Sequence, residues 1–295
     1  MKRVFFSTLT VLILALAGAN AALAQSIWIS PAAAGQEMAR GKVVLLDARS
    51  PKEYTSGHID GALSAPWQMF SDMTGKPGDP RWGTLLSPEK LGAAIGALGI
   101  SKSSRVLAYS SSPKGSGEDG RILWTLRSAG VPNVAIVDGG YEGWGAAGGK
   151  VSQVIVKGQP TEFAVSRIDG TLDVSKDQVK SMVGKARIID SRSVEEYAGS
   201  QTHGEPRGGH LPGALSLPWD KVFDSNGRMR SANALKKIMT DAGLKPEDEI
   251  ITYCTIGIRS AHLMTVLREI GYSKARNYSA SFYEWSGDVS LPLEK

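Results

Sequence analysis

The feature that most constrains this chain is that it repeats itself. The segment VVLLDARSPKEY (43–54) is matched by ARIIDSRSVEEY (186–197), and GHIDGALSAPW (57–67) is matched by GHLPGALSLPW (209–219). LRSAG then matches LREIG, and DGGYEGW matches SASFYEW, in the same order along both halves. Self-similarity of this kind indicates a tandem duplication of one domain. Any fold proposed for one half must therefore suit the other half as well.

Each copy alternates short apolar runs with segments of helical periodicity. In the second copy, IITY (250–253) has the character of a strand, and SAHLMTVLREIG (260–271) spaces its apolar residues as on one face of a helix that stops at a glycine. Alternating strands and helices indicate α/β units on a mostly parallel sheet. The sequence therefore predicts an α/β fold of two tandem domains, each a central parallel sheet flanked by helices.

The two ends of the first copy set the expected boundaries. The chain opens with Lys2 and Arg3, a short apolar stretch and the small residues Ala22-Leu23-Ala24, which is typical of a secretory signal peptide. Its apolar run is shorter than the roughly 20 residues of a membrane span. The Gly- and Pro-punctuated stretch GGKVSQVIVKGQPTEF marks a linker between the copies. We expect a signal peptide at 1–24, a first domain at 25–150, a linker at 151–167 and a second domain at 168–295, in a periplasmic or secreted protein without a membrane anchor.

Charge and histidine content exclude two classes of site. The formal net charge is +5, and the basic residues are scattered, with no Lys/Arg run and no interleaved aromatic platform. Nucleic-acid binding is therefore not expected, whereas small anions suit a mildly basic protein. The four histidines lack paired ligand spacing and there is no second cysteine, so neither a metal nor another cofactor is predicted.

Cys254 is the single cysteine, so no internal disulfide can form. It lies between the strand-like run and the helix-like run, at the place where parallel α/β sheets carry their chemistry. A loop of backbone N–H groups leading into a helix, together with Arg259, would lower the pKa of a thiol there, and Gly257 allows the loop to curl around the sulfur. We interpret Cys254 as a working thiol, with an inert buried cysteine as the alternative.

Several blocks resemble the signature blocks of the rhodanese superfamily: DSRSVEEY, GEPRGGHLPGALSLPW, YCTIGIRS and SFYEW. The two-copy arrangement resembles that of thiosulfate sulfurtransferases and mercaptopyruvate sulfurtransferases, over essentially the whole chain after the signal peptide. The resemblance implies two α/β domains with the active site at the base of the cleft between them. It further implies that Cys254, in the C-terminal copy, takes a sulfane sulfur as a persulfide and passes it on.

The resemblance also implies roles for the neighbours of this cysteine. The loop that follows it would surround the persulfide with backbone amides, which makes substrate-binding candidates of Thr255, Ile256, Gly257, Ile258 and Arg259. Arg207 matches an arginine with which the mercaptopyruvate branch holds a carboxylate, so it is a candidate anion ligand. The implied partners are a small anionic sulfur donor and a thiophilic acceptor such as cyanide or a thiol, including the thiol of a partner protein.

Two departures from the family pattern bear on the sulfur donor. Thr255 and Ile256 are uncharged, where thiosulfate enzymes often carry basic residues. Glu196 stands near the position of another arginine of the mercaptopyruvate branch, and a carboxylate there should repel a carboxylate substrate. The sequence therefore favours thiosulfate as donor, with 3-mercaptopyruvate as one alternative and a sulfane-sulfur carrier of little turnover as another.

The first copy carries Ser110 at the position of Cys254, with no histidine nearby in the sequence to act as a base. Its loop is longer and includes Glu118 and Asp119, which would oppose anion binding, so this copy is predicted to be a non-catalytic wall of the cleft. The same loop contains GSGEDG (115–120), which fits a dinucleotide-binding pattern, but five residues separate it from the strand and its two acids would face the pyrophosphate. We therefore reject nucleotide binding.

Other motifs point to structure or to chemistry that the spacing does not suit. The loops of phosphatases and arsenate reductases have the spacing Cys-x5-Arg, whereas four residues separate Cys254 from Arg259. The histidines at matching positions of the repeat are predicted to brace turns, and the Asp-x-Arg motifs are predicted to form charge pairs at strand ends. The residues concerned are His58, His210, Asp47, Arg49, Asp190 and Arg192.

Overall fold

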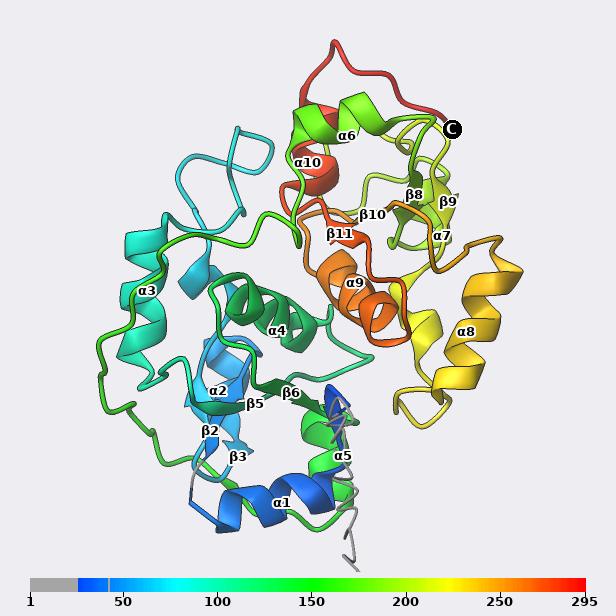
Figure 1. Cartoon of the computed structure of the whole chain (residues 1–295). Helices are drawn as coiled ribbons and strands as arrows, with labels where there is room; N and C mark the ends of the chain where they lie inside the picture. The colour runs from blue at the N-terminus through cyan, green and yellow to red at the C-terminus, as the bar shows by residue number, and fades with distance from the viewer. Residues whose placement is uncertain (1–25, 42) are drawn as a thin grey trace, which may run out of the picture.

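The structure is a computed structural model that describes residues 26–41 and 43–295. The predicted signal peptide at 1–24 lies outside the described residues. No described helix combines the length and the apolar character needed to cross a membrane. Two α/β units follow one another along the chain and pack side by side, as the colours of Figure 1 show.

The first unit is built around a five-stranded parallel sheet with the strand order β1-β6-β5-β2-β4. β3 and β7 form a separate short antiparallel pair. Helices and strands follow one another in the alternation that the sequence predicts. Its elements are β1 (Trp28–Ile29), α1 (Pro31–Ala39), β2 (Val43–Asp47), α2 (Pro51–Ser56), β3 (His58–Ile59), β4 (Leu63–Ser64), η1 (Trp67–Phe70), α3 (Pro88–Ala97), β5 (Arg105–Tyr109), α4 (Glu118–Ser128), β6 (Val134–Val137), α5 (Gly140–Ala146) and β7 (Val151–Ser152).

The second unit repeats this plan with a four-stranded parallel sheet in the order β11-β10-β8-β9. The first unit adds β1 as an edge strand, whereas the second unit ends at β11 on that side. The elements of the second unit are α6 (Lys176–Met182), β8 (Arg187–Asp190), α7 (Val194–Tyr197), β9 (Leu215–Ser216), η2 (Trp219–Val222), α8 (Ala232–Asp241), β10 (Ile250–Tyr253), α9 (Arg259–Glu269), β11 (Ala275–Asn277) and α10 (Ser281–Gly287).

The register of the central strands is the same in both units. Tyr109 of β5 pairs with Asp47 of β2, and Tyr253 of β10 pairs with Asp190 of β8. Each tyrosine hydroxyl also donates to the carboxylate of its aspartate, at 2.7 Å in the first unit and 2.6 Å in the second. Because the registers agree, the residues after β5 and β10 emerge at equivalent edges of the two sheets. These residues are the predicted counterparts, Ser110 and Cys254.

The two units share one apolar core across helices α4 and α9, which lie next to each other at the centre of Figure 1. Buried residues of α4, such as Ile122 and Leu126, belong to the same cluster as Leu263 and Leu267 of α9. Gly120 permits this close approach, because a Cβ atom at that position would lie 2.5 Å from the Cα of His262. The inner faces of the units therefore form a continuous interior.

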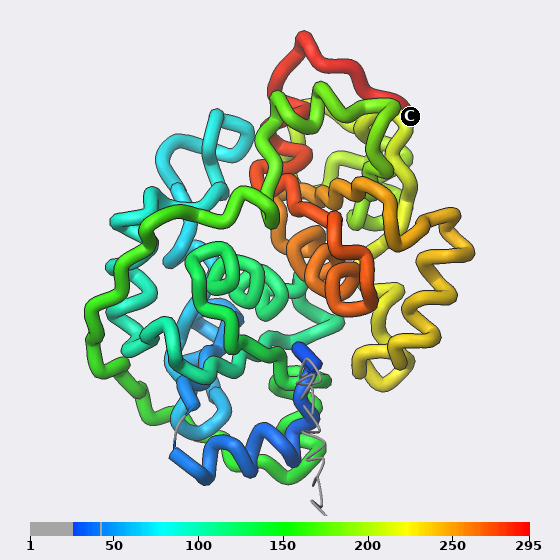
Figure 2. Tube along the Cα trace, in the orientation of Figure 1, coloured from blue at the N-terminus to red at the C-terminus, as the bar shows by residue number. Residues whose placement is uncertain are grey.

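The stretch between the units runs along the outside of the first one, beside α3 (Figure 2). The N–H of Thr161 donates to the carbonyl of Gly96, and Phe163 packs into the shared core. The segment packs closely against the face of α3 that carries Gly92, because a Cβ on Gly92 would lie 2.5 Å from the carbonyl oxygen of Phe163. The segment predicted as a linker is thus packed against the first unit.

Candidate functional site

Cys254 follows directly on β10, and only 1% of its surface is exposed to solvent. The N–H of Gly257 donates to the Cys254 sulfur at 3.1 Å, so the loop curls around the thiol as the sequence predicts. The backbone N–H of Cys254 donates to the hydroxyl of Ser281, which fixes the loop against the start of α10. The sulfur is therefore held by short local contacts at the carboxyl end of a central strand.

The curl of the loop requires a glycine at position 257. Gly257 has a φ of +77°, and a Cβ there would lie 2.2 Å from the carbonyl oxygen of Ser279. A side chain would thus meet both a strained backbone angle and a backbone atom that cannot move aside. Any other residue would displace the N–H that points at the sulfur.

The surroundings of Cys254 favour its anionic form. Burial raises the pKa of the thiol, but the positive charge of Arg259 and hydrogen bonds from Ser260 and the backbone of Ile256 outweigh it, so the pKa lies below its ordinary value. The loop leads into α9, which begins at Arg259, and the helix N-terminus contributes in the same direction. A larger fraction of reactive thiolate at neutral pH follows.

Arg259 forms an ion pair with Glu196, whose carboxylate binds both of its terminal nitrogens. The distances from Arg259 to the Glu196 carboxylate are 2.7 and 2.8 Å, and the Thr255 hydroxyl donates to the same carboxylate at 3.0 Å. Burial raises the pKa of Glu196, but the Arg259 guanidinium outweighs it and holds this pKa at about 2. The carboxylate that the sequence analysis expected to repel a substrate is therefore neutralised by its ion pair.

A pocket of about 340 Å³ opens above the sulfur. Both units contribute to its walls, so it lies in the cleft between them. Of the loop residues predicted as binding candidates, Thr255, Ile256, Ile258 and Arg259 line it, whereas Gly257 lies behind the sulfur. The full lining is Trp82, Gly115, Ser116, His203, Trp219, Cys254, Thr255, Ile256, Ile258, Arg259 and Tyr283.

The contacts of Arg207 correct its proposed role as an anion ligand. Its guanidinium donates to four backbone carbonyls at the end of the chain, those of Trp285, Ser286, Asp288 and Leu291. Arg207 is also absent from the lining of the pocket. Its donors are used to hold the segment after α10, because that segment presents carbonyls with no helical partner.

Arg121 of α4 reaches the Cys254 loop from the opposite unit, a contact that no sequence motif indicated. This fully buried side chain donates to the carbonyl of Gly257 at 3.0 Å and to the carbonyl of Gly83 at 2.6 Å. Burial lowers the pKa of Arg121 to about 10, while the charges of Asp173 and Cys254 raise it. A guanidinium from the first unit thus joins the Cys254 loop to the loop that carries Trp82.

The loop of the first unit is filled by its own side chains. The N–H of Ser116 donates to the carboxylate of Glu118, and the N–H of Gly120 donates to that of Asp119. Ser110 is fully buried and its hydroxyl contacts that of Ser112, at 2.9 Å. The amides that would bind an anion are thus taken up by the two acids that the sequence analysis singled out.

The remaining motifs have structural positions. His58 and His210 each bond a backbone carbonyl at 2.9 Å, those of Tyr54 and Tyr197, and each ring stacks on that tyrosine. The Asp-x-Arg motifs form buried ion pairs at the ends of β2 and β8. Within residues 26–41 and 43–295, no group of acidic, histidine and cysteine side chains is placed to hold a metal.

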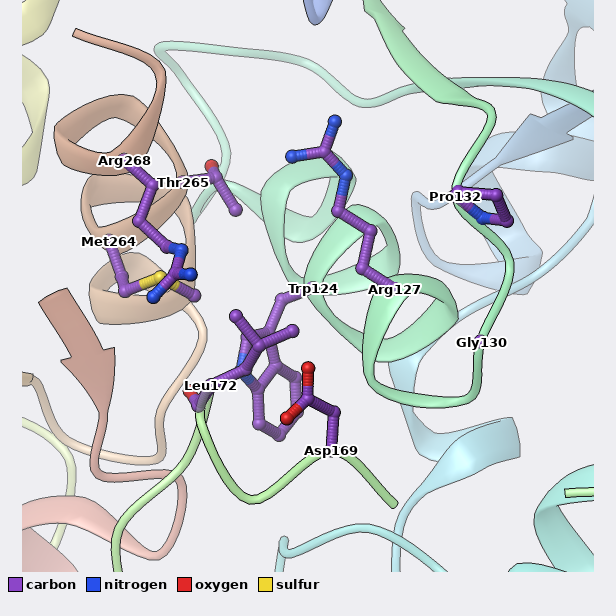
Figure 3. Close-up of a pocket in the computed structure, with 9 residues that line it drawn as sticks. All are labelled: Trp124, Arg127, Gly130, Pro132, Asp169, Leu172, Met264, Thr265 and Arg268. Carbon is purple, nitrogen blue, oxygen red and sulfur yellow. Dashed lines mark hydrogen bonds between the residues drawn. The ribbon is translucent and has the colours of Figure 1, made fainter. Parts of the chain in front are cut away.

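A second cavity of about 460 Å³ lies between α4 and α9. Figure 3 shows Arg127 on α4 and Arg268 on α9 on the two sides of this gap, with Trp124 between the helices. The Trp124 indole donates to the carbonyl of Leu172, which ties the segment just before α6 to α4. This cavity includes none of the residues of the Cys254 loop.

The model of the rhodanese-like domain family matches residues 30–147 and again residues 175–288. This chain belongs to the rhodanese family. The chain is 30% identical to the sulfur carrier protein TtuD of Thermus thermophilus over 255 residues, which is 82% of this chain and 87% of that one. It is 31% identical to the putative thiosulfate sulfurtransferase SseA of Mycobacterium tuberculosis over 249 residues, 81% of this chain and 80% of that one.

Solved structures agree in fold with this rhodanese. The wild-type structure of EanB superposes with a TM-score of 0.80 at 20% sequence identity, covering 91% of this chain and 69% of that one. The tandem arrangement of two α/β rhodanese domains, predicted from the repeat, is thereby confirmed.

Proposed function

We propose that this protein is a sulfurtransferase that moves a sulfane sulfur from thiosulfate to a thiophilic acceptor through a persulfide on Cys254. The observation that carries the proposal is the Cys254 sulfur at the base of an interdomain pocket, with the Gly257 N–H donating to it at 3.1 Å. The lowered pKa of this thiol supports a nucleophilic role. Membership of the rhodanese family supports the reaction class.

In the first step, the Cys254 thiolate attacks the outer sulfur of thiosulfate. The S–S bond of thiosulfate breaks, sulfite leaves with its electron pair, and a persulfide remains on Cys254. In the second step, cyanide or a thiolate attacks the outer sulfur of that persulfide, and the electron pair of the broken S–S bond returns to Cys254. Oriented N–H groups such as that of Gly257 stabilise the anionic sulfur without having to reorganise.

Thiosulfate is the proposed donor, and the structure suggests how it is held. Because Arg259 is paired with Glu196, the loop amides and the start of α9 supply most of the attraction for an anion. We therefore propose that the protein binds thiosulfate weakly, with a high KM. The donors of Arg207 are bound to backbone carbonyls, so this residue gives no support for 3-mercaptopyruvate as the donor.

A sulfane-sulfur carrier remains the second candidate function, favoured by the near-complete burial of Cys254. A persulfide enclosed in this way is protected from solvent and from chance acceptors. One relative, at 30% identity, is named a sulfur carrier protein. A partner protein with a reactive thiol would then take the place of a small acceptor.

The test is a steady-state assay with thiosulfate and cyanide, followed by the mass of the intact protein. Rapid thiocyanate formation that disappears in Cys254→Ser supports the enzyme. A stable gain of one sulfur atom on Cys254 with negligible turnover supports the carrier. Full activity in Cys254→Ser would contradict both.

We also propose that the protein is exported, on the signal-peptide pattern of residues 1–24. Cell fractionation with amino-terminal sequencing of the isolated protein tests this. A mature amino terminus at Gln25 in the exported fraction is the expected result, and an intact Met1 in the cytosolic fraction would contradict it.

A further inference from the structure

Three aromatic rings form part of the lining of the pocket above Cys254. Trp82 comes from the first unit, and Trp219 and Tyr283 come from the second. Trp82 and Tyr283 stand edge to face, with ring centroids 5.9 Å apart and an interplanar angle of 81°. Ile256 and Ile258 add apolar surface beside the sulfur. The approach to the thiol is thus largely apolar, although its floor is a loop of amides.

The charge of this pocket is balanced. Among the described residues, Arg259 is the only lysine or arginine in its lining, and Glu196 binds both of its terminal nitrogens from a position that is itself buried. His203, half exposed at the rim, places its Nε2 3.7 Å from the same Glu196 carboxylate. An anion that enters the pocket therefore finds no unpaired guanidinium or ammonium group among the lining residues.

The size of the pocket exceeds what the simplest substrates require. A volume of about 340 Å³ lies within the range of sites that bind small organic molecules. Thiosulfate and cyanide would occupy only a part of it. Trp82, Trp219 and Tyr283 border this pocket, and a planar ring can stack on such side chains or meet their edges.

The wall that carries Trp82 is fixed relative to the sulfur. The Arg121 guanidinium binds the carbonyl of Gly83, next to Trp82, and the carbonyl of Gly257, next to the thiol loop. Trp82 also packs edge to face on Trp67, with centroids 6.4 Å apart. A preorganised wall of this kind contributes to selectivity because little order is lost when a ligand binds.

We propose that the acceptor of this sulfurtransferase is a small thiol that carries a planar ring and no charged group besides its reacting sulfur. The inference rests on the proposed persulfide chemistry and adds the class of the second substrate. The acceptor thiolate attacks the outer sulfur of the Cys254 persulfide, a new S–S bond forms, and the old S–S bond breaks with its electron pair returning to Cys254. The products are the ring-bearing persulfide and the free thiolate of the enzyme, with no net oxidation.

The test measures discharge of the persulfide in a single turnover. Cys254 is loaded with inorganic polysulfide, excess reagent is removed, and loss of one sulfur atom is followed by mass spectrometry. Two pairs of acceptors separate ring from charge: 2-phenylethanethiol against 1-propanethiol, and uncharged 2-mercaptoethanol against anionic 2-mercaptoethanesulfonate. Each rate constant is divided by the rate constant of the same thiol with glutathione persulfide, which removes differences in intrinsic nucleophilicity.

We expect 2-phenylethanethiol to discharge the persulfide about tenfold faster than 1-propanethiol, as an aromatic contact of ordinary strength allows. The neutral mercaptoethanol should exceed its sulfonate analogue. In Trp82→Leu the ratio for the ring-bearing pair should fall to about one, and Trp82→Phe should restore most of it. The ratio is independent of how much protein is folded or loaded, so a general loss of stability does not move it.

Equal normalised rates for 2-phenylethanethiol and 1-propanethiol in the wild-type protein would overturn the acceptor inference while leaving the proposed function intact. So would a ratio unchanged by Trp82→Leu, or a faster reaction of the sulfonate. If Cys254 takes up no sulfur from polysulfide or thiosulfate, the proposed function itself fails. The loading step therefore distinguishes the two failures.

Discussion

The two rhodanese domains share a frame around their central strands, and the loop that follows the equivalent strand differs between them. Both place an Asp-x-Arg ion pair at the end of a central strand, and both close it with a tyrosine hydroxyl from the neighbouring strand. After β10 the loop directs the Gly257 N–H at a sulfur, whereas after β5 the equivalent stretch directs its amides at Glu118 and Asp119. The two loops thus differ in their contacts without a change in the arrangement of the central strands.

The first domain instead contributes to the site of the second one. Arg121 binds the carbonyl of Gly257, Trp82 forms one wall of the pocket, and Ser116 lines it. The comparison teaches that one copy supplies the proposed nucleophile and the other supplies part of its surroundings. The changes below would break or sharpen this division, beginning with the largest expected effect.

Exchange of the residues after β5 and β10 should abolish sulfur transfer. Cys254→Ser should lower thiocyanate formation by at least about a thousandfold, since an alcohol is a far weaker nucleophile at neutral pH. The double variant Cys254→Ser, Ser110→Cys should stay inactive, because the amides around position 110 are bound by Glu118 and Asp119. Recovered activity in the double variant would show that both loops are competent.

Gly257→Ala should disrupt the thiol loop. A Cβ at this position would lie 2.2 Å from the Ser279 carbonyl at a φ of +77°, so we expect a loss of about 2 kcal/mol in the free energy of unfolding and a large loss of activity. Gly213→Ala is the matched control, because Gly213 has a φ of +68° but open space around its Cβ. Denaturant unfolding and thiocyanate formation measure the two effects, and equal losses of activity in both variants would contradict the assignment.

Arg121→Met should raise the pKa of Cys254, because a buried positive charge next to its loop is removed. The midpoint of thiolate formation, followed by ultraviolet absorbance, should move to higher pH by about one pH unit. Arg121→Lys should restore most of the thiolate at neutral pH. Arg127→Met, on the same helix but outside the site, should leave the midpoint in place, and a similar rise there would argue against a specific role of Arg121.

Glu196→Gln should release the Arg259 guanidinium and strengthen thiosulfate binding. We expect KM for thiosulfate to fall by about threefold to tenfold, since a charge-assisted contact becomes available. Glu53→Gln is the control from the other domain, because Glu53 caps its helix in the same way but binds no arginine within the described chain. An unchanged KM in Glu196→Gln would mean that Arg259 takes no part in donor binding.

The same ion pair predicts a smaller effect on stability in acid. The pKa of Glu196 is held at about 2, below its ordinary value near 4.5, so its contribution to stability is present above pH 4.5 and lost as the pH falls toward 2. Glu196→Gln should therefore flatten the decline of the unfolding free energy across that interval. Urea unfolding at several pH values provides the measurement, and an identical decline in both proteins would contradict it.

The fold could be predicted from the sequence because the repeat presents each helix and strand pattern twice. The cysteine loop was also predictable, since Cys254 follows a strand and precedes a helix in the sequence itself. Contacts between segments far apart in the sequence could not be predicted in this way. Glu196 was expected to repel substrates, but its pairing with Arg259 joins residues 63 positions apart and depends on the closing of the loop.

The contributions of the first domain were the least predictable part. Arg121 opens an apolar helical run, RILWTL, and a charge at the start of such a run was the available signal for a buried cation. Trp82 lies outside the repeated blocks, whereas Trp219 and Tyr283 lie inside them. Arg207 was misplaced because a motif match does not reveal that four carbonyls consume its donors.

The bond from Arg121 to Gly257 also bears on how such a duplicated chain can evolve or be shortened. A gene fragment encoding the second domain alone would keep the cysteine, but it would lose the guanidinium behind its loop and leave the apolar face of α9 uncovered. Deletion of the first domain is therefore not a neutral simplification. A minimal single-domain version would need a new buried cation and a polar resurfacing of α9 before its thiol could behave as it does in the pair.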